Sequence, residues 1–258
     1  MKRHMTLYKA LALASVFTLA ATAAGAEVMI DPRRVEFSPR DRSAELRLFN
    51  TGTERQTFRL GWVQLRMLPS GDLVEAKASD PVHGSSDMIR FSPRQVTLEP
   101  GERQTVRLSL RKPAGLADGE YLSHLSLATD QGVSQPVSRR GEGGATVELY
   151  INYGHSIPVV VRHGAASASV SIADAKTLSQ DGQSHLSINF TRHGNSGVHG
   201  SVIVRQGRDV LGQLNGIALY REVDRRQILV PLSRQPSGPV SVEYVDASGK
   251  LIASASAR

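Results

Sequence analysis

Short runs in which apolar and polar residues alternate recur along most of this chain, and turn sequences separate them. Two clear runs are SAELRLFN at 43–50 and RQTVRLSL at 103–110, and typical turn sequences are TGTE, LPSGD and EPGE. A period of two places successive side chains on opposite faces of a strand, so one face of each run can be buried. No segment shows a sustained helical period. The pattern predicts an all-β chain built as antiparallel β-sandwiches with little helix.

The succession of alternating runs is interrupted at RHGAAS, residues 162–167, and alternating runs then recur to the end of the chain. Small residues in a short polar connection are typical of a domain boundary. A chain of 258 residues is long enough for two domains, each with its own hydrophobic core. We therefore expect two β-sandwich domains, the first spanning residues 27–162 and the second residues 163–258.

The first residues are expected to be an export signal rather than part of the fold. A basic start, MKRHMTLYK, precedes the apolar run ALALASVFTLAATA, and small residues stand at Ala24 and Ala26. This combination is typical of a cleaved secretory signal peptide, so we expect residues 1–26 to be removed before Glu27. Later apolar runs fall short of the ~20 residues that a spanning helix needs. The mature chain should therefore be exported, with no membrane insertion.

Charge and cysteine content narrow the chemistry. Loss of the signal peptide removes Lys2, Arg3 and Lys9 and lowers the formal net charge from +7 to +4. The remaining arginines are scattered and few aromatic residues lie among them, which argues against a nucleic-acid partner. The chain has no cysteine, so disulfides and thiol chemistry are excluded. No cofactor motif is present, and GEGG at 141–144 lacks the Lys-Ser/Thr of a phosphate-binding loop.

Catalytic and metal-binding patterns are weak. HGNSG at 193–197 approaches a serine-nucleophile turn, but Val198 stands where that motif needs glycine. His155, Asp174 and Ser196 occur in a His, Asp, Ser order, although order alone does not establish the geometry of a triad. The histidine spacings match no common ligand motif, so no metal site is expected. The sequence favours a protein that is not an enzyme.

The stretch GGATVELYINYGHSIPVVV, residues 143–161, has apolar side chains at Val147, Leu149, Ile151 and Tyr153. A long polar segment, DQGVSQPVSRRGEGG at 130–144, directly precedes it. Two interpretations fit the alternation. The four side chains can belong to the core of the first sandwich, or they can line an exposed edge that a partner pairs by β-augmentation. An edge of that kind would also allow two copies of the chain to self-associate.

Three stretches resemble the PapD-like periplasmic chaperones of pilus and fimbrial subunits. They are IDPRRVEF at 30–37, IRFSPRQVTLEPGERQTVRL at 89–108 and DGEYLSHL at 118–125, and INFTRHGNSGVHGSVIV at 188–204 agrees more loosely. The resemblance implies two immunoglobulin-like β-sandwich domains in a boomerang arrangement with a cleft between them. It also implies a periplasmic protein that donates the last strand of its first domain to an incomplete subunit and delivers that subunit to an outer-membrane usher. The donated residues would be Val147, Leu149, Ile151 and Tyr153.

The same resemblance implies that an arginine of the first strand anchors the carboxylate at the end of the subunit, and this position matches Arg34. Arg33 is an alternative, and Arg34 paired with Asp31 or Glu36 at the surface is another. An arginine suits the role because its planar group makes two charge-assisted hydrogen bonds to a carboxylate.

The family places a lysine on the donated strand as a second anchor, whereas this chain has none between Lys112 and Lys176. The resemblance also assigns Glu120 to an interdomain ion pair, for which Arg162 is the expected partner. The alternative function is a two-domain structural or adhesive β-sandwich protein of the cell surface.

Overall fold

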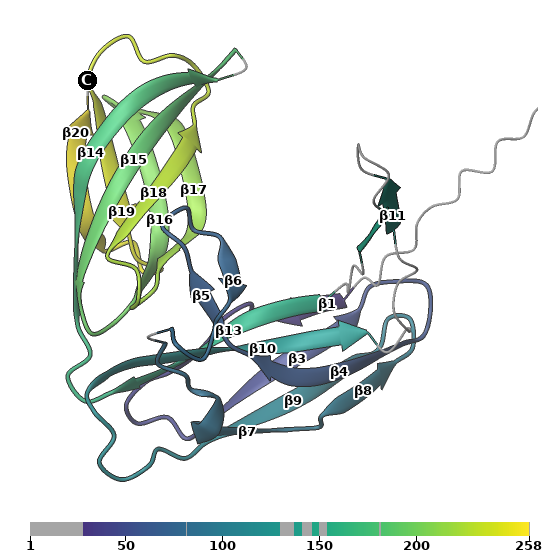
Figure 1. Cartoon of the computed structure of the whole chain (residues 1–258). Coiled ribbons are helices and arrows are strands. Elements are labelled where there is room, and N and C mark those ends of the chain that lie inside the picture. The colour runs from purple at the N-terminus through teal and green to yellow at the C-terminus, as the bar shows by residue number, and fades with distance from the viewer. Residues whose placement is uncertain are drawn as a thin grey trace, which may run out of the picture.

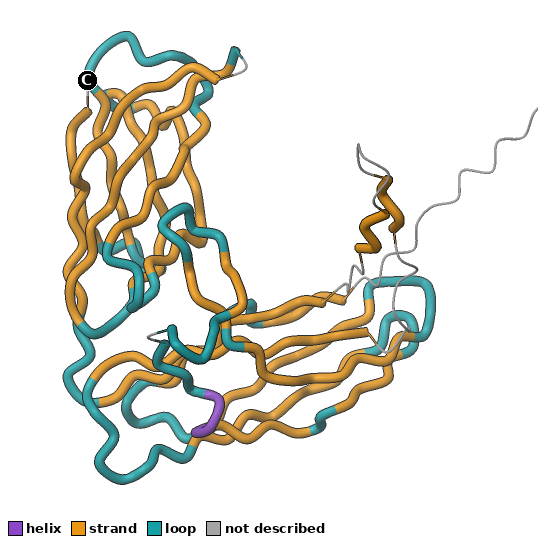
Figure 2. Tube along the Cα trace, viewed as in Figure 1, coloured by secondary structure: helices purple, strands orange, loops and turns teal. Residues whose placement is uncertain are grey.

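The structure is a computed structural model that describes residues 28–80, 82–129, 137–140, 146–149, 154–180 and 182–257. The expected signal peptide and its cleavage site lie outside the described residues. Strands run through most of the described chain, as Figure 2 shows in orange. The one helical element among these residues is the 3-10 turn η1, Ser86–Met88. The prediction of an all-β chain with little helix is confirmed.

Two sheets make up the first sandwich. The four-stranded sheet has the order β1 (Val28–Asp31), β3 (Ser43–Asn50), β9 (Arg103–Leu110), β7 (Ile89–Ser92). The five-stranded sheet has the order β2 (Val35–Phe37), β13 (Gly154–His163), β10 (Gly119–Thr129), β4 (Gln56–Val63), β8 (Gln95–Leu98). Every pairing is antiparallel except that of β2 with β13, which is parallel. The first strands and the last strand of this sandwich therefore meet at one edge.

The second sandwich also has two sheets, both antiparallel. The three-stranded sheet has the order β14 (Ala168–Gln180), β15 (Gln183–Gly194), β18 (Arg225–Pro231). The four-stranded sheet has the order β17 (Asp209–Leu219), β16 (Val198–Gln206), β19 (Val240–Val245), β20 (Leu251–Ala257). The strand β17 follows from no prediction above, because its glycines and polar residues interrupt the alternation.

Alternation determines which residues enter each core. On β9 the buried residues are Val106, Leu108 and Leu110, and every residue between them is exposed. The first core is apolar and includes Phe37, Phe58 and Leu125 from the five-stranded sheet. The second core is separate from the first and is built around Phe190 and Tyr244, among other residues. Two cores with their own sheet pairs confirm the fold class of two β-sandwiches.

The two sandwiches lie at an angle to each other, so the molecule is bent (Figure 1). β13 ends at His163 and β14 begins at Ala168, which leaves a short connection at the bend. Two further hairpins lie outside the four sheets. One is β5 (Leu65–Met67) with β6 (Leu73–Glu75), and the other is β11 (Val137–Arg140) with β12 (Thr146–Leu149). The division of the chain after residue 162 stays a prediction.

Candidate functional site

An apolar cluster joins the two sandwiches at the bend. Leu122 on β10 and Val160 on β13 belong to it and come from the first sandwich, while Tyr220 and Val223 come from the second. Val160 is fully buried even though Val159 and Val161, on either side of it, point into the first core. Both faces of β13 are therefore covered at this point, one by its own sandwich and one by the other. This cluster holds the bend together by the burial of apolar surface.

Glu120 at the start of β10 is the centre of the polar contacts between the sandwiches. Its backbone N–H donates to the Asn195 carbonyl at 2.9 Å, and its own carbonyl accepts from Arg221 Nη1 at 3.0 Å. The Ser196 hydroxyl donates to Glu120 Oε2 at 3.1 Å. The side chain of Glu120 is 2% exposed. A buried acid with these partners fixes the position of the 195–197 turn against β10.

The β5–β6 hairpin reaches from the first sandwich to the second and lies between them in Figure 1. The backbone N–H of Met67 donates to Glu222 Oε1 at 3.2 Å, and the N–H of Gln227 donates to the Pro69 carbonyl at 2.9 Å. Burial raises the pKa of Glu222, in spite of the backbone hydrogen bonds that oppose the rise. The hairpin thus braces the bend on the side away from the connecting segment.

A histidine and a tyrosine meet across the same interface. His124 Nε2 and the Tyr220 hydroxyl lie 3.0 Å apart, and His124 is 1% exposed. Burial, with a smaller effect from the charge of Arg34, lowers the pKa of His124 to about 4. Burial also raises the pKa of Tyr220 to about 12. At neutral pH both groups are therefore uncharged, which suits an apolar surrounding.

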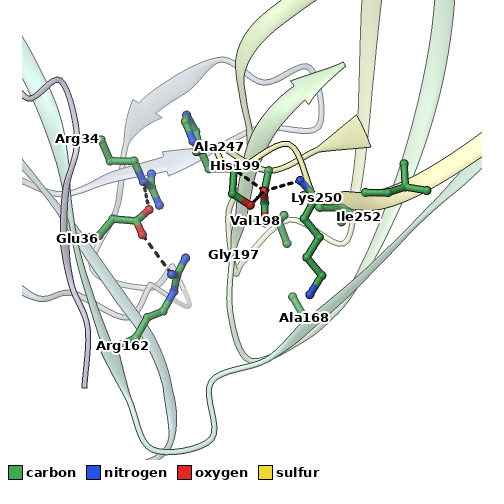
Figure 3. Close-up of a pocket in the computed structure, with 13 residues that line it drawn as sticks. Arg34, Glu36, Arg162, Ala168, Gly197, Val198, His199, Ala247, Lys250 and Ile252 are labelled. Carbon is green, nitrogen blue, oxygen red and sulfur yellow. Dashed lines mark hydrogen bonds and ion pairs between the residues drawn. The ribbon is translucent and has the colours of Figure 1, made fainter. Parts of the chain in front are cut away.

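A cleft with a volume of about 810 Å³ opens between the sandwiches beside this interface. Arg34, Glu36 and Arg162 line one wall, and residues of the second sandwich line the other, including His199 and Lys250 (Figure 3). Glu36 bridges the two arginines. Its Oε1 accepts from Arg34 Nε at 2.5 Å and its Oε2 from Arg162 Nη1 at 3.1 Å. The wall contributed by the first sandwich is therefore charged, and the two contacts of Glu36 hold its side chains in a defined arrangement.

The charges of the cleft set the protonation of its acid and its histidine. Burial alone would raise the pKa of Glu36, but the hydrogen bond from Arg34 and the charges of Arg34 and Arg162 lower it overall. Burial and the charge of Arg34 lower the pKa of His199, against the opposing effect of Glu36. At neutral pH Glu36 is ionised and His199 is neutral.

Arg34, the predicted carboxylate anchor, lies in the bend between β1 and β2 and lines the cleft. Its side chain is 14% exposed, and it makes the ion pair with Glu36 that the sequence left open as an alternative. Asp31 pairs instead with Arg47. Arg33 lines a different groove, next to β1 and β13. Of the two neighbouring arginines, Arg34 is therefore the one that faces the space between the sandwiches.

Glu120 and Arg162 form the expected ion pair, with 3.4 Å between Arg162 Nε and Glu120 Oε2. The description of this pair as interdomain needs correction. The two residues lie directly opposite each other on the neighbouring strands β10 and β13, so both belong to the first sandwich. Glu120 contacts the second sandwich through Ser196 and the 195–197 turn.

The stretch expected to form one strand at 143–161 is divided in the structure. Val147 and Leu149 lie on β12, which pairs with β11 in a two-stranded sheet, whereas β13 belongs to the five-stranded sheet of the first sandwich. The remaining donor residues, Ile151 and Tyr153, lie outside the described residues. Part of the polar segment 130–144 is itself strand, namely β11. Because β12 pairs with β11, it is not continuous with the sheet that contains β13.

The outer edge of β13 is open over half of its length. On one side β13 pairs with β10 from residue 154 to residue 163, but on the other side β2 covers only residues 159–161. No described strand pairs with residues 154–158 on that side. A groove of about 260 Å³ adjoins this edge and is lined by Val28 to Ile30 and by His155 to Ile157, among others. This edge directly follows the predicted donor residues.

The residues considered for hydrolysis do not share a site. The hydroxyl of Ser196 is directed to Glu120 and to the Gly197 carbonyl, and Ser196 is buried between the sandwiches. Asp174 is paired with Lys176 on β14, and His155 lies on the open edge of β13. Within the described ranges no cluster of three or more metal-ligating side chains occurs. No helix in that part of the chain has the length and apolar composition to cross a membrane.

Three residues that shape this site could not be identified from their local sequence. Lys250 lies in the turn between β19 and β20, His199 lies on β16, and Tyr220 follows β17. Only the folded topology brings these segments to the first sandwich. Val160 did carry a signal, because three consecutive valines at 159–161 break the alternation and indicate a strand that is buried on both faces.

No family model and no curated protein matches this sequence. Among solved structures, the chain is similar to CsuC in the CsuC-CsuE chaperone-tip adhesion subunit pre-assembly complex of Acinetobacter baumannii, at 15% identity and a TM-score of 0.47, over 90% of this chain and 97% of that one.

It is also similar to the YadV chaperone, at 13% identity and a TM-score of 0.47 over 90% of this chain and 98% of the other. The chain is similar as well to the Pseudomonas aeruginosa CupB2 chaperone, at 12% identity and a TM-score of 0.46 over 88% of this chain and 98% of the other. The printed descriptions of all three structures name a chaperone.

Proposed function

We propose that this chain is a periplasmic chaperone that binds pilus or fimbrial subunits by lending them a β-strand. The observation that carries the proposal is the open edge of β13 at residues 154–158, which continues from the predicted donor stretch. An unpaired edge presents a row of backbone N–H and C=O groups that another chain can pair with. The outermost edge of the first sandwich is therefore suited to receive a strand of a partner.

Residue parity along β13 supports the same proposal. Ile157, Val159 and Val161 turn into the core of the first sandwich. In a strand that continues β13 toward the N-terminus, the side chains of residues 147, 149, 151 and 153 share that face. A subunit that lacks a strand would then receive a row of apolar side chains that continues the core-facing side of β13.

The energy available is sufficient for binding. Four apolar side chains placed in a dry groove contribute roughly 1.5–3 kcal/mol each before the costs of association. Each new backbone hydrogen bond adds about 1 kcal/mol net. Ordering and association offset much of this sum, yet micromolar or tighter affinity is within reach. No chemical step is needed, so the proposal assigns no catalytic residue.

Arg34 supplies a second point of contact in the proposal. It uses Nε for Glu36, and neither of its terminal amino groups donates to another described residue. Those two donors match the two oxygens of a carboxylate at the end of a bound subunit. Export through the signal peptide at 1–26 would place the chain in the periplasm, and an outer-membrane usher would take the subunit from it.

The test is co-expression of a pilus subunit encoded beside this gene, with wild-type chain or with variants. Leu149→Glu places a charge in the predicted apolar row, whereas Thr146→Glu places the same charge on the opposite face of the same strand. We expect a one-to-one complex with wild type and with Thr146→Glu, and loss of the complex with Leu149→Glu. Equal recovery of the complex from both variants would refute strand donation, and a structural or adhesive role would then be favoured.

A further inference from the structure

His124 lies on the face of β10 that is turned away from the first core. Its neighbour Leu125 belongs to that core, whereas Leu122 belongs to the apolar cluster at the bend, and alternation along the strand places His124 on the same face as Leu122. His124 is nevertheless 1% exposed, and its ring lies against that of Tyr220 from the second sandwich, with 5.8 Å between the ring centroids. Separation of the sandwiches would therefore give water access to this ring without opening either core.

The neutral ring of His124 fits this place, and a protonated ring does not. Nε2 has the Tyr220 hydroxyl as its partner at 3.0 Å, but Nδ1 is buried without a hydrogen-bond partner among the described residues. A protonated imidazole carries an N–H on both nitrogens, so one of the two donors would be left unpaired. An unpaired buried donor on a charged ring is costlier than an unpaired lone pair on a neutral one.

The charged groups of the first sandwich do not compensate a positive charge on His124. Burial, and in addition the charge of Arg34 from the bend between β1 and β2, lowers the pKa of His124 to about 4. Glu36 is already bound by Arg34 and Arg162, and Glu120 shares Arg162 with it. Both carboxylates are thus engaged by arginines, and a protonated ring would add a charge that has no partner of its own.

The charged groups of the second sandwich act in the same direction. Glu222 and Arg226 lie near the Tyr220 hydroxyl. Burial raises the pKa of Glu222, so acid neutralises this carboxylate earlier than an exposed one, while Arg226 keeps its positive charge. On the opposite wall of the cleft, burial and the charge of Arg34 lower the pKa of His199 (Figure 3). Acid therefore adds positive charge or removes negative charge on both sides of the interface.

We propose that protonation of His124 opens the bend, so that in acid the two sandwiches separate at this interface while each keeps its own core. The inference goes beyond the proposed function and does not depend on strand donation. In the opened chain the ring contacts water and takes up its proton at the ordinary pKa of 6.5, compared with about 4 in the closed chain. Between about pH 7.5 and about pH 5 the ratio of opened to closed chains should therefore rise about thirtyfold through this residue alone. Because the walls of the cleft belong to different sandwiches, the opening also changes the width of the cleft.

The test is amide hydrogen exchange followed by NMR on the chain without residues 1–26. Two backbone N–H groups report opening because they donate across the bend, that of Glu120 to the Asn195 carbonyl and that of Gln227 to the Pro69 carbonyl, both at 2.9 Å. Amides in the middle of β9 report unfolding of the first core, since β9 pairs on both sides within its own sheet. Protection, the intrinsic exchange rate divided by the observed rate, should be lower at the two interface amides than on β9. It should fall about thirtyfold or more between about pH 7.5 and about pH 5, with little dependence on urea.

Two variants assign the change to its residue. His124→Gln should make the fall in protection at the interface amides smaller by about thirtyfold, because glutamine takes up no proton in this range. His185→Gln is the matched control. His185 lies at the start of β15, at the end of that strand opposite to the 195–197 turn, and the variant should respond to pH as wild type does.

Three results would overturn the inference. The first is protection at the interface amides that stays constant to within about threefold over this pH range in wild type. The second is an equal fall in His124→Gln and His185→Gln. The third is exchange of the interface amides with the protection and urea dependence of β9, because the bend would then open only when the first core unfolds. The first and third are measured on wild type and decide the question even if His124→Gln fails to fold. None of the three bears on strand donation, which the Leu149→Glu and Thr146→Glu comparison tests separately.

Discussion

His124 should make the stability of this protein fall as the pH drops below neutrality. The group is neutral and buried at the interface of the two sandwiches, and its pKa in the folded chain is about 4, compared with 6.5 in the unfolded chain. A lowered pKa means that the unfolded state takes up the proton first. The stability that the neutral histidine permits is therefore complete above its unfolded pKa and is lost as the pH falls through the range between 6.5 and about 4.

The two pKa values set the size of the effect. Between about pH 7.5 and about pH 5 the histidine alone should lower the free energy of unfolding by about 2 kcal/mol. Urea unfolding followed by the fluorescence of Trp62 measures it, since Trp62 is the only tryptophan and packs against the first core. His83 and His199 also have lowered pKa values, so the wild-type change includes their share.

A His124→Gln variant isolates the contribution of this one residue. The variant will differ from wild type at neutral pH, but the quantity of interest is the change with pH within each protein. We expect that change to be smaller in His124→Gln by about 2 kcal/mol. If the two proteins lose the same free energy to within about 0.5 kcal/mol, His124 is not desolvated at the interface and the packing of the sandwiches described above is wrong.

Two further substitutions test the bend, and a third tests an exposed ion pair of the first sandwich. Arg192→Met should lower the free energy of unfolding by about 3–4 kcal/mol in urea titrations, because the buried guanidinium donates to four backbone carbonyls as well as to an acid. A loss below about 1 kcal/mol would contradict this reasoning. Ser196→Ala removes a donor to Glu120 and should lower the free energy of unfolding by about 1–2 kcal/mol. It should also widen the distribution of interdomain distances in small-angle scattering. An unchanged distribution would show that the apolar cluster is sufficient to hold the angle between the sandwiches. Arg107→Ala breaks an exposed ion pair and should change stability by less than about 0.5 kcal/mol in the same titration, and a larger loss would mean that exposed pairs contribute more here than elsewhere.

The sequence predicted best where alternation is unbroken. The runs at 43–50 and 103–110 coincide with β3 and β9, because each strand has one face on the core and one in solvent. It failed at β17, where Gly212 and Gly216 interrupt the alternation. Gly212 is needed there, since a Cβ would lie 2.5 Å from the Pro231 carbonyl oxygen. Close approach of two strands is a tertiary condition that no local pattern records.

Only the part of the candidate site that the first sandwich contributes was predictable from the sequence. Arg34, Glu120 and Arg162 were identified from stretches that resemble a family, and all three lie at the cleft or at the bend beside it. The opposite wall was not predicted, because nothing in the sequence near Lys250 or His199 indicates that these residues face the first sandwich. That information lies in the angle between the sandwiches, which the apolar cluster and the contacts of Glu120 determine together.

The pairing of β13 along its whole length with β10 has a mechanical consequence. Ten consecutive residues of β13, from 154 to 163, are matched to residues of β10. A pull on the chain upstream of Gly154 acts along the axis of the strand, while the antiparallel hydrogen bonds run across it. The bonds are then loaded together in shear and do not peel apart one after another. Tension applied through a captured partner would therefore reach the bend between the sandwiches before the strand came loose.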